Sequence, residues 1–404
     1  MRKQQFFTHF KCTLALLALS AYSSVQADIN FPIPDAPQLQ NVGAYILIDA
    51  KSGEILTQHN ADQRRDPASL TKMMTSYVIG EAIKSGRISN SDMVLISKDA
   101  WATGNPVLKG SSLMFLEVGK QVSVENLNKG IIIQSGNDAC IAMAEHVAGS
   151  QDSFVGLMNN YVKQLGLENT HFQTVHGLDA PDQYTTAHDM AFLGQALINN
   201  LPNEYAIYKQ KEFKYNLNKP QLNRNGLLWD TTLNVDGIKT GHTNNAGFNL
   251  VASAVDGNTR LISVVMGAKS DKERESKSKQ LLIWGFRSFE TTTPVKANES
   301  KVTKTIWYGK EDKVELGSMD DIYVTVPKGQ AVNLQIKYKM DSDYISAPIE
   351  QGVKVGTMQF LLNDQVVAEK PLVTLEKVEE TGLFGMAVDY VALKFRQWFS
   401  YFFD

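Results

Sequence analysis

Three short motifs hold the residues of this chain that are best suited to chemistry. A serine hydroxyl becomes a nucleophile when a neighbouring base accepts its proton, and a lysine can act as that base. Each motif alone is short, and one of them recurs, because a second Ser-x-x-Lys occurs at 276–279. Only the first copy lies upstream of both other motifs, so the ordered set predicts a serine acyl-transfer site with a lysine base. The motifs are Ser69 to Lys72 (Ser-Leu-Thr-Lys), Ser135 to Asn137 (Ser-Gly-Asn) and Lys239 to Gly241 (Lys-Thr-Gly).

The first motif predicts a nucleophile and its base at the start of a helix. Residues three apart on a helix face the same side, with Cβ atoms about 5–6 Å apart, so Lys72 can reach Ser69. An ordinary lysine has a pKa of about 10.4 and needs burial or a nearby positive charge, such as Lys239, to be neutral near pH 7. Taken alone, the motif equally fits a serine that caps a helix, followed by an exposed lysine.

The second motif supplies a further hydroxyl and an amide. Ser135 can relay a proton between the lysine base and the leaving amine. The amide of Asn137 can both donate to and accept from a substrate peptide group. Without the other motifs, an ordinary turn that starts a helix explains these residues equally well.

The third motif supplies a cation and a hydroxyl at the end of an apolar, strand-like run. Lys239 and Thr240 can hold a substrate carboxylate, and Gly241 lets a substrate backbone approach closely. The backbone N–H groups of Ser69 and His242 are candidates for an oxyanion hole. The plain alternative is the end of a strand with a solvated lysine.

The N-terminal segment and the composition restrict the classes of function. A basic start, an apolar run and small residues before position 28 predict a secretory signal over 1–27. Without this segment the net charge changes from −3 to −6, which argues against a nucleic-acid partner. Cys140 is then the sole cysteine, so no intramolecular disulfide is expected, and a buried inert thiol is favoured over a nucleophile. The seven histidines lack ligand spacing, and neither a metal nor a cofactor is expected.

The segments that must position the motifs alternate between strand and helix patterns. Strand-like runs lie at both ends of the region 28–290 with helical periodicity between them, so we expect an α+β fold around one sheet built from distant segments. A hairpin with Gly53 at its turn begins this sheet. The expected strands are 43–49, 54–58, 235–240, 247–255 and 259–266, and the expected helices are 69–84, 123–133, 137–148, 151–165, 187–200 and 271–289.

The remaining chain predicts two further parts. Short apolar runs separated by Gly, Pro and Asp turns predict a small all-β domain over 291–376. Residues 377–404 predict an amphipathic helix whose aromatic stripe favours binding to a membrane surface, with packing on the β domain as the alternative. The expected strands of the β domain are 302–308, 322–326, 332–338, 357–362 and 365–369.

With these motifs and segments, the chain resembles the penicillin-recognising serine peptidases. Within them it is similar to the low-molecular-mass D-alanyl-D-alanine carboxypeptidases of the penicillin-binding protein 5/6 type, which have a β-lactamase-like catalytic domain, a small β domain and a terminal helix. The resemblance covers nearly the whole chain. It is carried by the segments 67–74, 134–140, 176–179, 235–243, 274–276 and 284–286.

The resemblance implies a hydrolase that removes the terminal D-alanine from peptidoglycan pentapeptide stems and that β-lactams acylate. Ser69 would form the acyl-enzyme with the help of Lys72 and Ser135. Lys239, Thr240 and Arg274 would hold the terminal carboxylate. The implied substrate-binding residues are Asn137, Lys239, Thr240, Gly241, His242, Arg274 and Arg224.

The resemblance also implies a location and leaves alternatives open. The signal and the terminal helix imply a periplasmic enzyme attached to the outer face of the inner membrane of a Gram-negative bacterium. The second motif is Ser-Gly-Asn, where class A β-lactamases have Ser-Asp-Asn, and no counterpart of their deacylating glutamate loop is evident. Slow turnover of a β-lactam acyl-enzyme is therefore expected. The alternatives are a DD-endopeptidase or weak β-lactamase on the same scaffold, and a non-catalytic cell-wall scaffold.

Overall fold

The computed structural model describes residues 33–403, so the predicted signal over 1–27 lies outside the described residues. A five-stranded antiparallel sheet, in the order β2-β1-β9-β8-β7, forms the centre of the catalytic region. An early strand, β1, pairs with a late strand, β9, which confirms that distant segments build one sheet. The strands are β1 (Ala44–Asp49), β2 (Ile55–His59), β7 (Val235–Thr243), β8 (Gly247–Asp256) and β9 (Thr259–Ala268).

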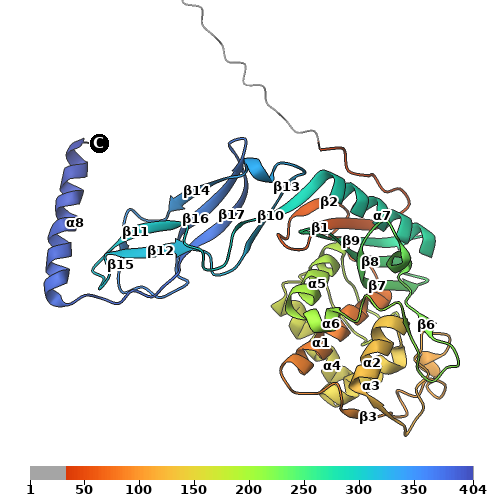
Figure 1. Cartoon of the computed structure of the whole chain (residues 1–404). Coiled ribbons are helices and arrows are strands. Elements are labelled where there is room, and N and C mark those ends of the chain that lie inside the picture. The colour runs from red at the N-terminus through yellow and green to blue at the C-terminus, as the bar shows by residue number, and fades with distance from the viewer. Residues whose placement is uncertain (1–32, 404) are drawn as a thin grey trace, which may run out of the picture. The chain divides into compact units, whose positions relative to one another are not determined.

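Both faces of this sheet are covered by helices (Figure 1). Every residue of β1 is buried, because its alternate side chains enter two different cores. Ile46 and Ile48 belong to the core shared with α5 (Ala187–Asn200), whereas Tyr45 and Leu47 belong to the core shared with α7 (Asp271–Ser288). This two-sided burial explains why the strands read as continuous apolar runs.

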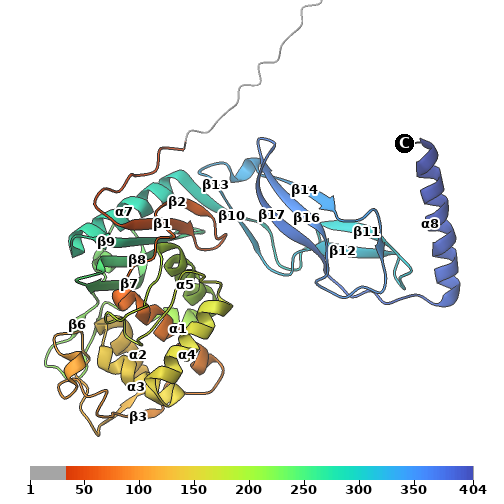
Figure 2. The same ribbon diagram turned by 180° about the vertical axis from the view of Figure 1, so that it is seen from behind.

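The remaining helices of the catalytic region form a lobe on the α5 side of the sheet (Figure 2). The predicted helix positions are confirmed to within a few residues. Four short strands and one short helix had no prediction from the sequence. The helices are α1 (Thr71–Lys84), α2 (Val124–Lys129), α3 (Asn137–Ala148), α4 (Gln151–Gln164) and α6 (Pro202–Tyr205), and the strands are β3 (Met93–Leu95), β4 (Gln121–Ser123), β5 (Glu212–Phe213) and β6 (Gln221–Leu222).

Hydroxyl side chains determine where several of these helices begin. In each case the side-chain oxygen accepts a hydrogen bond from the backbone N–H three residues later, which satisfies a donor that the helix itself leaves free. This explains why the predicted starts of the helices agree closely with the structure. The capping residues are Ser123 before α2, Ser150 before α4, Thr186 before α5 and Ser270 before α7.

The β region that follows has a core of its own, which includes Val314, Phe360 and Leu372. Its larger sheet has the strand order β14-β16-β17-β12-β11-β15, and β10 pairs separately with β13. The strand expected at 332–338 begins later, because 331–333 form a 3₁₀ turn in which Val332 is 90% exposed. The strands are β10 (Phe289–Val295), β11 (Val302–Trp307), β12 (Lys313–Gly317), β13 (Ile322–Pro327), β14 (Gln335–Met340), β15 (Ile345–Ser346), β16 (Lys354–Leu362) and β17 (Gln365–Thr374).

The predicted terminal helix is present as α8 (Leu383–Phe403). Its described apolar side chains are mostly exposed, with Leu393 as a buried exception. Within residues 33–403 no helix is both long and apolar enough to cross a membrane. The exposed stripe consists of Phe384, Val388, Val391, Phe395 and Trp398.

Candidate active site

Ser69 lies in a 3₁₀ turn, Ala68–Leu70, that leads directly into α1. The sheet holds this turn in place through Asn249 of β8, whose Nδ2 donates to the carbonyl of Asp66 at 3.2 Å. The Oδ1 of the same amide accepts from the backbone N–H of Gly267 on β9. The nucleophile candidate is therefore anchored to two central strands rather than to a loose loop.

Lys72 is fully buried beneath Ser69. Its Nζ donates to Ser69 Oγ at 3.0 Å and to the carbonyl of His176 at 2.5 Å. Burial lowers the pKa of Lys72 to about 8, and the positive charge of Arg224 acts in the same direction. The sequence had suggested Lys239 as the neighbouring cation. The two amines do repel each other, and this repulsion helps to lower the pKa of Lys239.

Ser135 stands at the end of a π-helical turn, Gly130–Gln134, in the left-handed conformation with φ 61°. Such turns are frequent at functional sites. Lys239 Nζ donates to Ser135 Oγ at 3.0 Å and to the carbonyl of Thr240 at 3.1 Å. Lys239 is only 3% exposed, and burial is the main reason why its pKa lies well below the usual range. The structure thus contains two buried serine–lysine contacts.

Two glycines allow two other segments of the chain to pack closely against the turn that carries Ser69, which we call the nucleophile turn. Gly177 has φ +86°, and a Cβ there would lie 1.9 Å from the carbonyl oxygen of Ala68. A Cβ at Gly241 would lie 3.0 Å from the carbonyl oxygen of Pro67 and 3.1 Å from the backbone N of Ser69. The first approach places the carbonyl of the preceding residue on Lys72, a contact that sequence reasoning missed.

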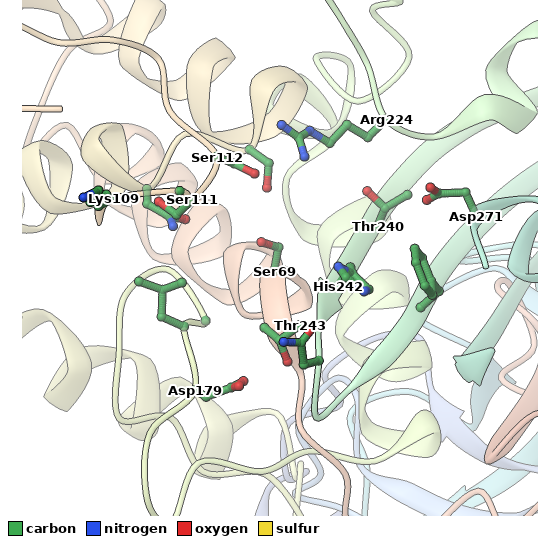
Figure 3. Close-up of a pocket in the computed structure, with 18 of the residues that line it drawn as sticks. Ser69, Lys109, Ser111, Ser112, Asp179, Arg224, Thr240, His242, Thr243 and Asp271 are labelled. Carbon is green, nitrogen blue, oxygen red and sulfur yellow. The ribbon is translucent and has the colours of Figure 1, made fainter. Parts of the chain in front are cut away.

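A cleft of about 820 Å³ opens above the two serines. Figure 3 shows Ser69 at its centre, with Ser112 and Arg224 on one side and Thr240 on β7 on the other. The two lysines lie beneath this surface rather than on it. Sequence reasoning missed Lys109, Ser111, Ser112, Asp179 and Asp271 of the lining. The predicted residues that line the cleft are Ser69, Ser135, Asn137, Arg224, Thr240, Gly241, His242 and Arg274.

Asn137 lines this cleft and carries a buried polar atom without a partner in the described structure. The residue is 3% exposed, and its Oδ1 has no hydrogen-bond partner in the described structure. A buried acceptor without a partner costs free energy, which a bound donor would recover. A substrate peptide N–H is such a donor.

Arg274 provides a nearly buried cation at the β7 side of the cleft. Its Nη1 donates to the carbonyl of Gly241 at 3.3 Å, and its guanidinium forms an ion pair with Asp271 and lies 5.7 Å from the ring centre of Phe248. The ring of His242 stacks on the ring of Phe248, with 4.0 Å between the two ring centres. The cation is therefore held rigidly beside Thr240.

Two other sequence candidates are placed away from the chemistry. Cys140 is fully buried, and burial raises the pKa of its thiol to about 12, which confirms an inert thiol. The second Ser-x-x-Lys lies on α7, where Ser276 is exposed and Lys279 pairs with Asp230 at 2.5 Å. Within residues 33–403 no group of three or more His, Cys, Asp or Glu side chains is placed to hold a metal ion.

The fold and the site together define a class of enzyme. A helical lobe packs on an antiparallel sheet, one helix starts with a serine–lysine pair, a second serine precedes another helix, and a cationic strand lies opposite. The class is that of serine acyl-transfer enzymes that use lysine in place of histidine.

Comparison with known proteins specifies the family. A family model described as D-alanyl-D-alanine carboxypeptidase matches residues 33–270, and one described as the C-terminal domain of penicillin-binding protein 5 matches 289–380. The D-alanyl-D-alanine carboxypeptidase DacA of Escherichia coli (strain K12) is 55% identical over 382 residues, 95% of this chain and 94% of that protein. The chain therefore belongs to the D-alanyl-D-alanine carboxypeptidase family, as a member of the penicillin-binding protein 5/6 type.

Solved structures agree with this assignment. Penicillin-binding protein 5 from Haemophilus influenzae has a TM-score of 0.82 and 48% identity, over 86% of this chain and 100% of that chain. Penicillin-binding protein D2 from Listeria monocytogenes, in a cefotaxime-bound form, has a TM-score of 0.56 and 27% identity, over 63% of this chain and 100% of that chain.

The close approach at Gly177 generates a prediction about stability. Gly177→Ala should lower the free energy of unfolding by about 2–5 kcal/mol, the sum of the left-handed backbone cost and of overpacking. Gly149 is the matched control, because its φ is +79° and a Cβ there meets nothing within 4 Å. Gly149→Ala should cost only about 1–2 kcal/mol. Denaturant unfolding measures both, and equal losses would contradict the importance of the contact with Ala68.

Proposed function

We propose that this chain is a periplasmic serine-type DD-carboxypeptidase that removes the terminal D-alanine from peptidoglycan pentapeptide stems. One observation carries the proposal: a buried lysine amine with a lowered pKa lies 3.0 Å from a serine hydroxyl that opens into a cleft. Family membership supplies the reaction class, and the contacts within the site supply the steps.

In the acylation step, the neutral amine of Lys72 accepts the proton of Ser69 as the hydroxyl oxygen attacks the carbonyl between the two D-alanines. The C–N bond then breaks, and the leaving amine takes the proton that Lys72 has accepted, relayed through Ser135, whose hydroxyl also contacts Lys239. Water hydrolyses the resulting ester and frees Ser69. The oxyanion is stabilised by the backbone N–H groups of Ser69 and His242.

The cationic side of the cleft suits the free carboxylate that an exopeptidase must recognise. Thr240 supplies a hydroxyl, and Arg274 and Arg224 supply positive charge around it, with the buried amine of Lys239 beneath them. Asn137 holds the substrate amide through its unpartnered oxygen. The cation cluster therefore suits a substrate that carries a carboxylate next to the scissile amide.

β-Lactams are proposed to acylate the same serine, because their ring amide and carboxylate match the two groups that the cleft binds. The solved relative in its cefotaxime-bound form is consistent with this. Within the described chain no glutamate lines the cleft. The acyl-enzyme should therefore be long-lived, which makes a weak β-lactamase the second candidate function.

We further propose the domain bounds 28–290, 291–376 and 377–404 after a signal at 1–27, in a Gram-negative bacterium. Binding of α8 to the outer face of the inner membrane is supported by its exposed aromatic stripe.

The reaction is tested with purified mature chain and a peptide that ends in D-Ala-D-Ala. Ser69→Ala should reduce D-alanine release by at least about 10³-fold, because the nucleophile is lost. It should also abolish covalent labelling by a fluorescent penicillin. Ser276→Ala is the matched control and should retain both activities. Labelling that persists in Ser69→Ala would remove the proposal. If the wild type shows neither labelling nor release of D-alanine, the result would favour the scaffold alternative. If it hydrolyses penicillin rapidly, the result would favour the β-lactamase alternative.

The lowered pKa of Lys72 predicts a pH profile. The base is the neutral amine, so the acylation rate should rise about tenfold per pH unit below pH 8 and level off above it. A lysine with an ordinary pKa would keep the rate rising beyond pH 9. Lys72→Arg keeps the charge but does not lose a proton, and should be inactive throughout. Stopped-flow labelling by penicillin measures the rate, and a flat profile from pH 6 to 9 would contradict Lys72 as the base.

The exposed stripe of α8 predicts membrane binding. A chain that ends at Glu379 should lose sedimentation with phospholipid vesicles and keep soluble carboxypeptidase activity. Val391→Glu should weaken vesicle binding about tenfold, because an apolar side chain 67% exposed in water is replaced by a charge. Val367→Glu adds the same charge at an exposed valine of β17 and is the control. Equal binding of the two variants would contradict the role of the stripe.

A further inference from the structure

A buried carboxylate outside the cleft connects helices α1 and α2. Glu204 lies in the short helix α6 and is 6% exposed, in the wall of a second cavity of about 980 Å³. Its Oε1 accepts from Ser76 Oγ on α1 at 2.6 Å. The amide Nδ2 of Asn128 on α2 donates to Oε1 at 2.8 Å and to Oε2 at 2.7 Å. Ser76 and Asn128 are both fully buried.

Both partners are close in the chain to the proposed catalytic groups. Ser76 follows Lys72 by one helical turn, so the two side chains share one face of α1. Asn128 leads through the π-helical turn, Gly130–Gln134, to Ser135 without a break in the helical backbone. A change in the position of Glu204 is therefore transmitted through short, regular segments to the base and to the second serine.

The packing around α6 is too close to be incidental. Gly80 is one further turn along the same face of α1, and a Cβ there would lie 2.8 Å from Leu201 Cδ1 and 3.2 Å from Glu204 Cγ. The next residue, Tyr205, donates through its hydroxyl to Asp236 of β7 at 2.8 Å, three residues before Lys239. Within α6, Glu204 and Tyr205 thus contact α1, α2 and β7.

We propose that Glu204 is a positioning residue for the acylation reaction, whose ionised carboxylate holds α1 and α2 together and thereby sets the position of Lys72 relative to Ser135. The inference rests on the roles proposed above for those two residues. It assigns a function to a carboxylate that makes no contact with the cleft.

The contacts identify the ionised form as the one that holds the two helices. Three donor contacts converge on the two carboxylate oxygens, whereas Asn128 Oδ1 has no partner in the described structure. A protonated Glu204 must itself donate, to Ser76 Oγ or to the unpartnered Asn128 Oδ1, and either choice requires a present donor to reorient. Charge-assisted hydrogen bonds are about twice as strong as neutral ones, so protonation loosens the link between the helices.

The ionisation of Glu204 falls in the range where the enzyme would be assayed. Burial raises its pKa to about 7, against the effect of hydrogen bonds from Ser76 and Asn128. The other titratable groups around it are the Tyr208 hydroxyl, on the turn that follows α6, and three charged side chains that line the same cavity. Of these three, Glu125 and Lys129 pair with each other at 2.6 Å, and Lys84 donates to the carbonyl of Asn200.

The test compares the acylation rate of the full mature chain with that of Glu204→Gln, using a fluorescent penicillin from pH 6 to pH 9. The titration of Lys72 is common to both proteins and cancels in the ratio of their rates. We expect a ratio, wild type over variant, near one at pH 6 that rises roughly three- to tenfold with a midpoint near pH 7. Glu125→Gln, which removes a carboxylate from the same cavity, should give a ratio that does not change with pH.

Ser76→Ala supplies a second readout that loss of stability alone would not move. The Ser76 hydrogen bond lowers the pKa of Glu204, so its removal should shift the midpoint to higher pH. That shift is measured as the ratio of two acylation rates, the rate of Ser76→Ala divided by the rate of the double variant Ser76→Ala, Glu204→Gln. A ratio that stays constant from pH 6 to 9, in proteins that are labelled and folded, would overturn the inference. Failure of the wild type to be labelled would instead overturn the proposed function.

Thermal unfolding shows independently whether Glu204 ionises. Its pKa is raised in the folded chain, so the folded state binds more protons than the unfolded state between about pH 4.5 and 7. The associated stability is present below this range and is lost as the pH rises through 7. The melting temperature of the wild type should therefore fall relative to that of Glu204→Gln as the pH rises from 5 to 8. Parallel melting curves would also contradict the inference.

Discussion

The burial of two lysine side chains is the constraint on which the rest of the site depends. An ammonium group that leaves water loses several kcal/mol of solvation unless it is paired or gives up its proton. Lys72 and Lys239 have no carboxylate partner; each contacts a serine hydroxyl and a backbone carbonyl instead. The proton is therefore weakly held, and the same burial that costs stability produces a base.

This arrangement requires backbone carbonyl oxygens within hydrogen-bond distance of the two lysine amines, and the chain must pack closely around the nucleophile to bring them there. The loop that carries His176 can reach Lys72 because Gly177 accepts both a left-handed conformation and contact with the nucleophile turn. On the strand side, Gly241 allows β7 to lie against the same turn. The two approaches hold the turn that carries the serine in place, so little reorganisation is needed when the acyl group forms.

The sequence predicted those parts of the fold that follow from local patterns. The cap residues Ser150, Thr186 and Ser270 and the apolar periodicity define helix positions, and the ordered motifs identify Ser69. Contacts made by backbone atoms, such as the His176 carbonyl on Lys72, leave no mark on residue type. Helix α6 was missed because four residues are too few for a periodic signal.

The groups that shift each pKa in the site were the hardest property to predict from the sequence. The sequence suggested burial or a nearby cation, such as Lys239, as the cause of a lowered pKa at Lys72. In the structure burial is the largest cause, Arg224 adds to it, and Lys72 and Lys239 repel each other. Burial depends on side chains from the whole lobe, and the family resemblance indicated Arg224 only as a residue that binds substrate. The π-helical turn before Ser135 adds a constraint of a different kind. Adding or removing one residue in 130–134 would change this turn and displace Ser135 from its contact with Lys239. Selection must therefore conserve the length of this segment as strictly as the identity of the serine, so insertions and deletions should be absent there even in relatives whose residues differ.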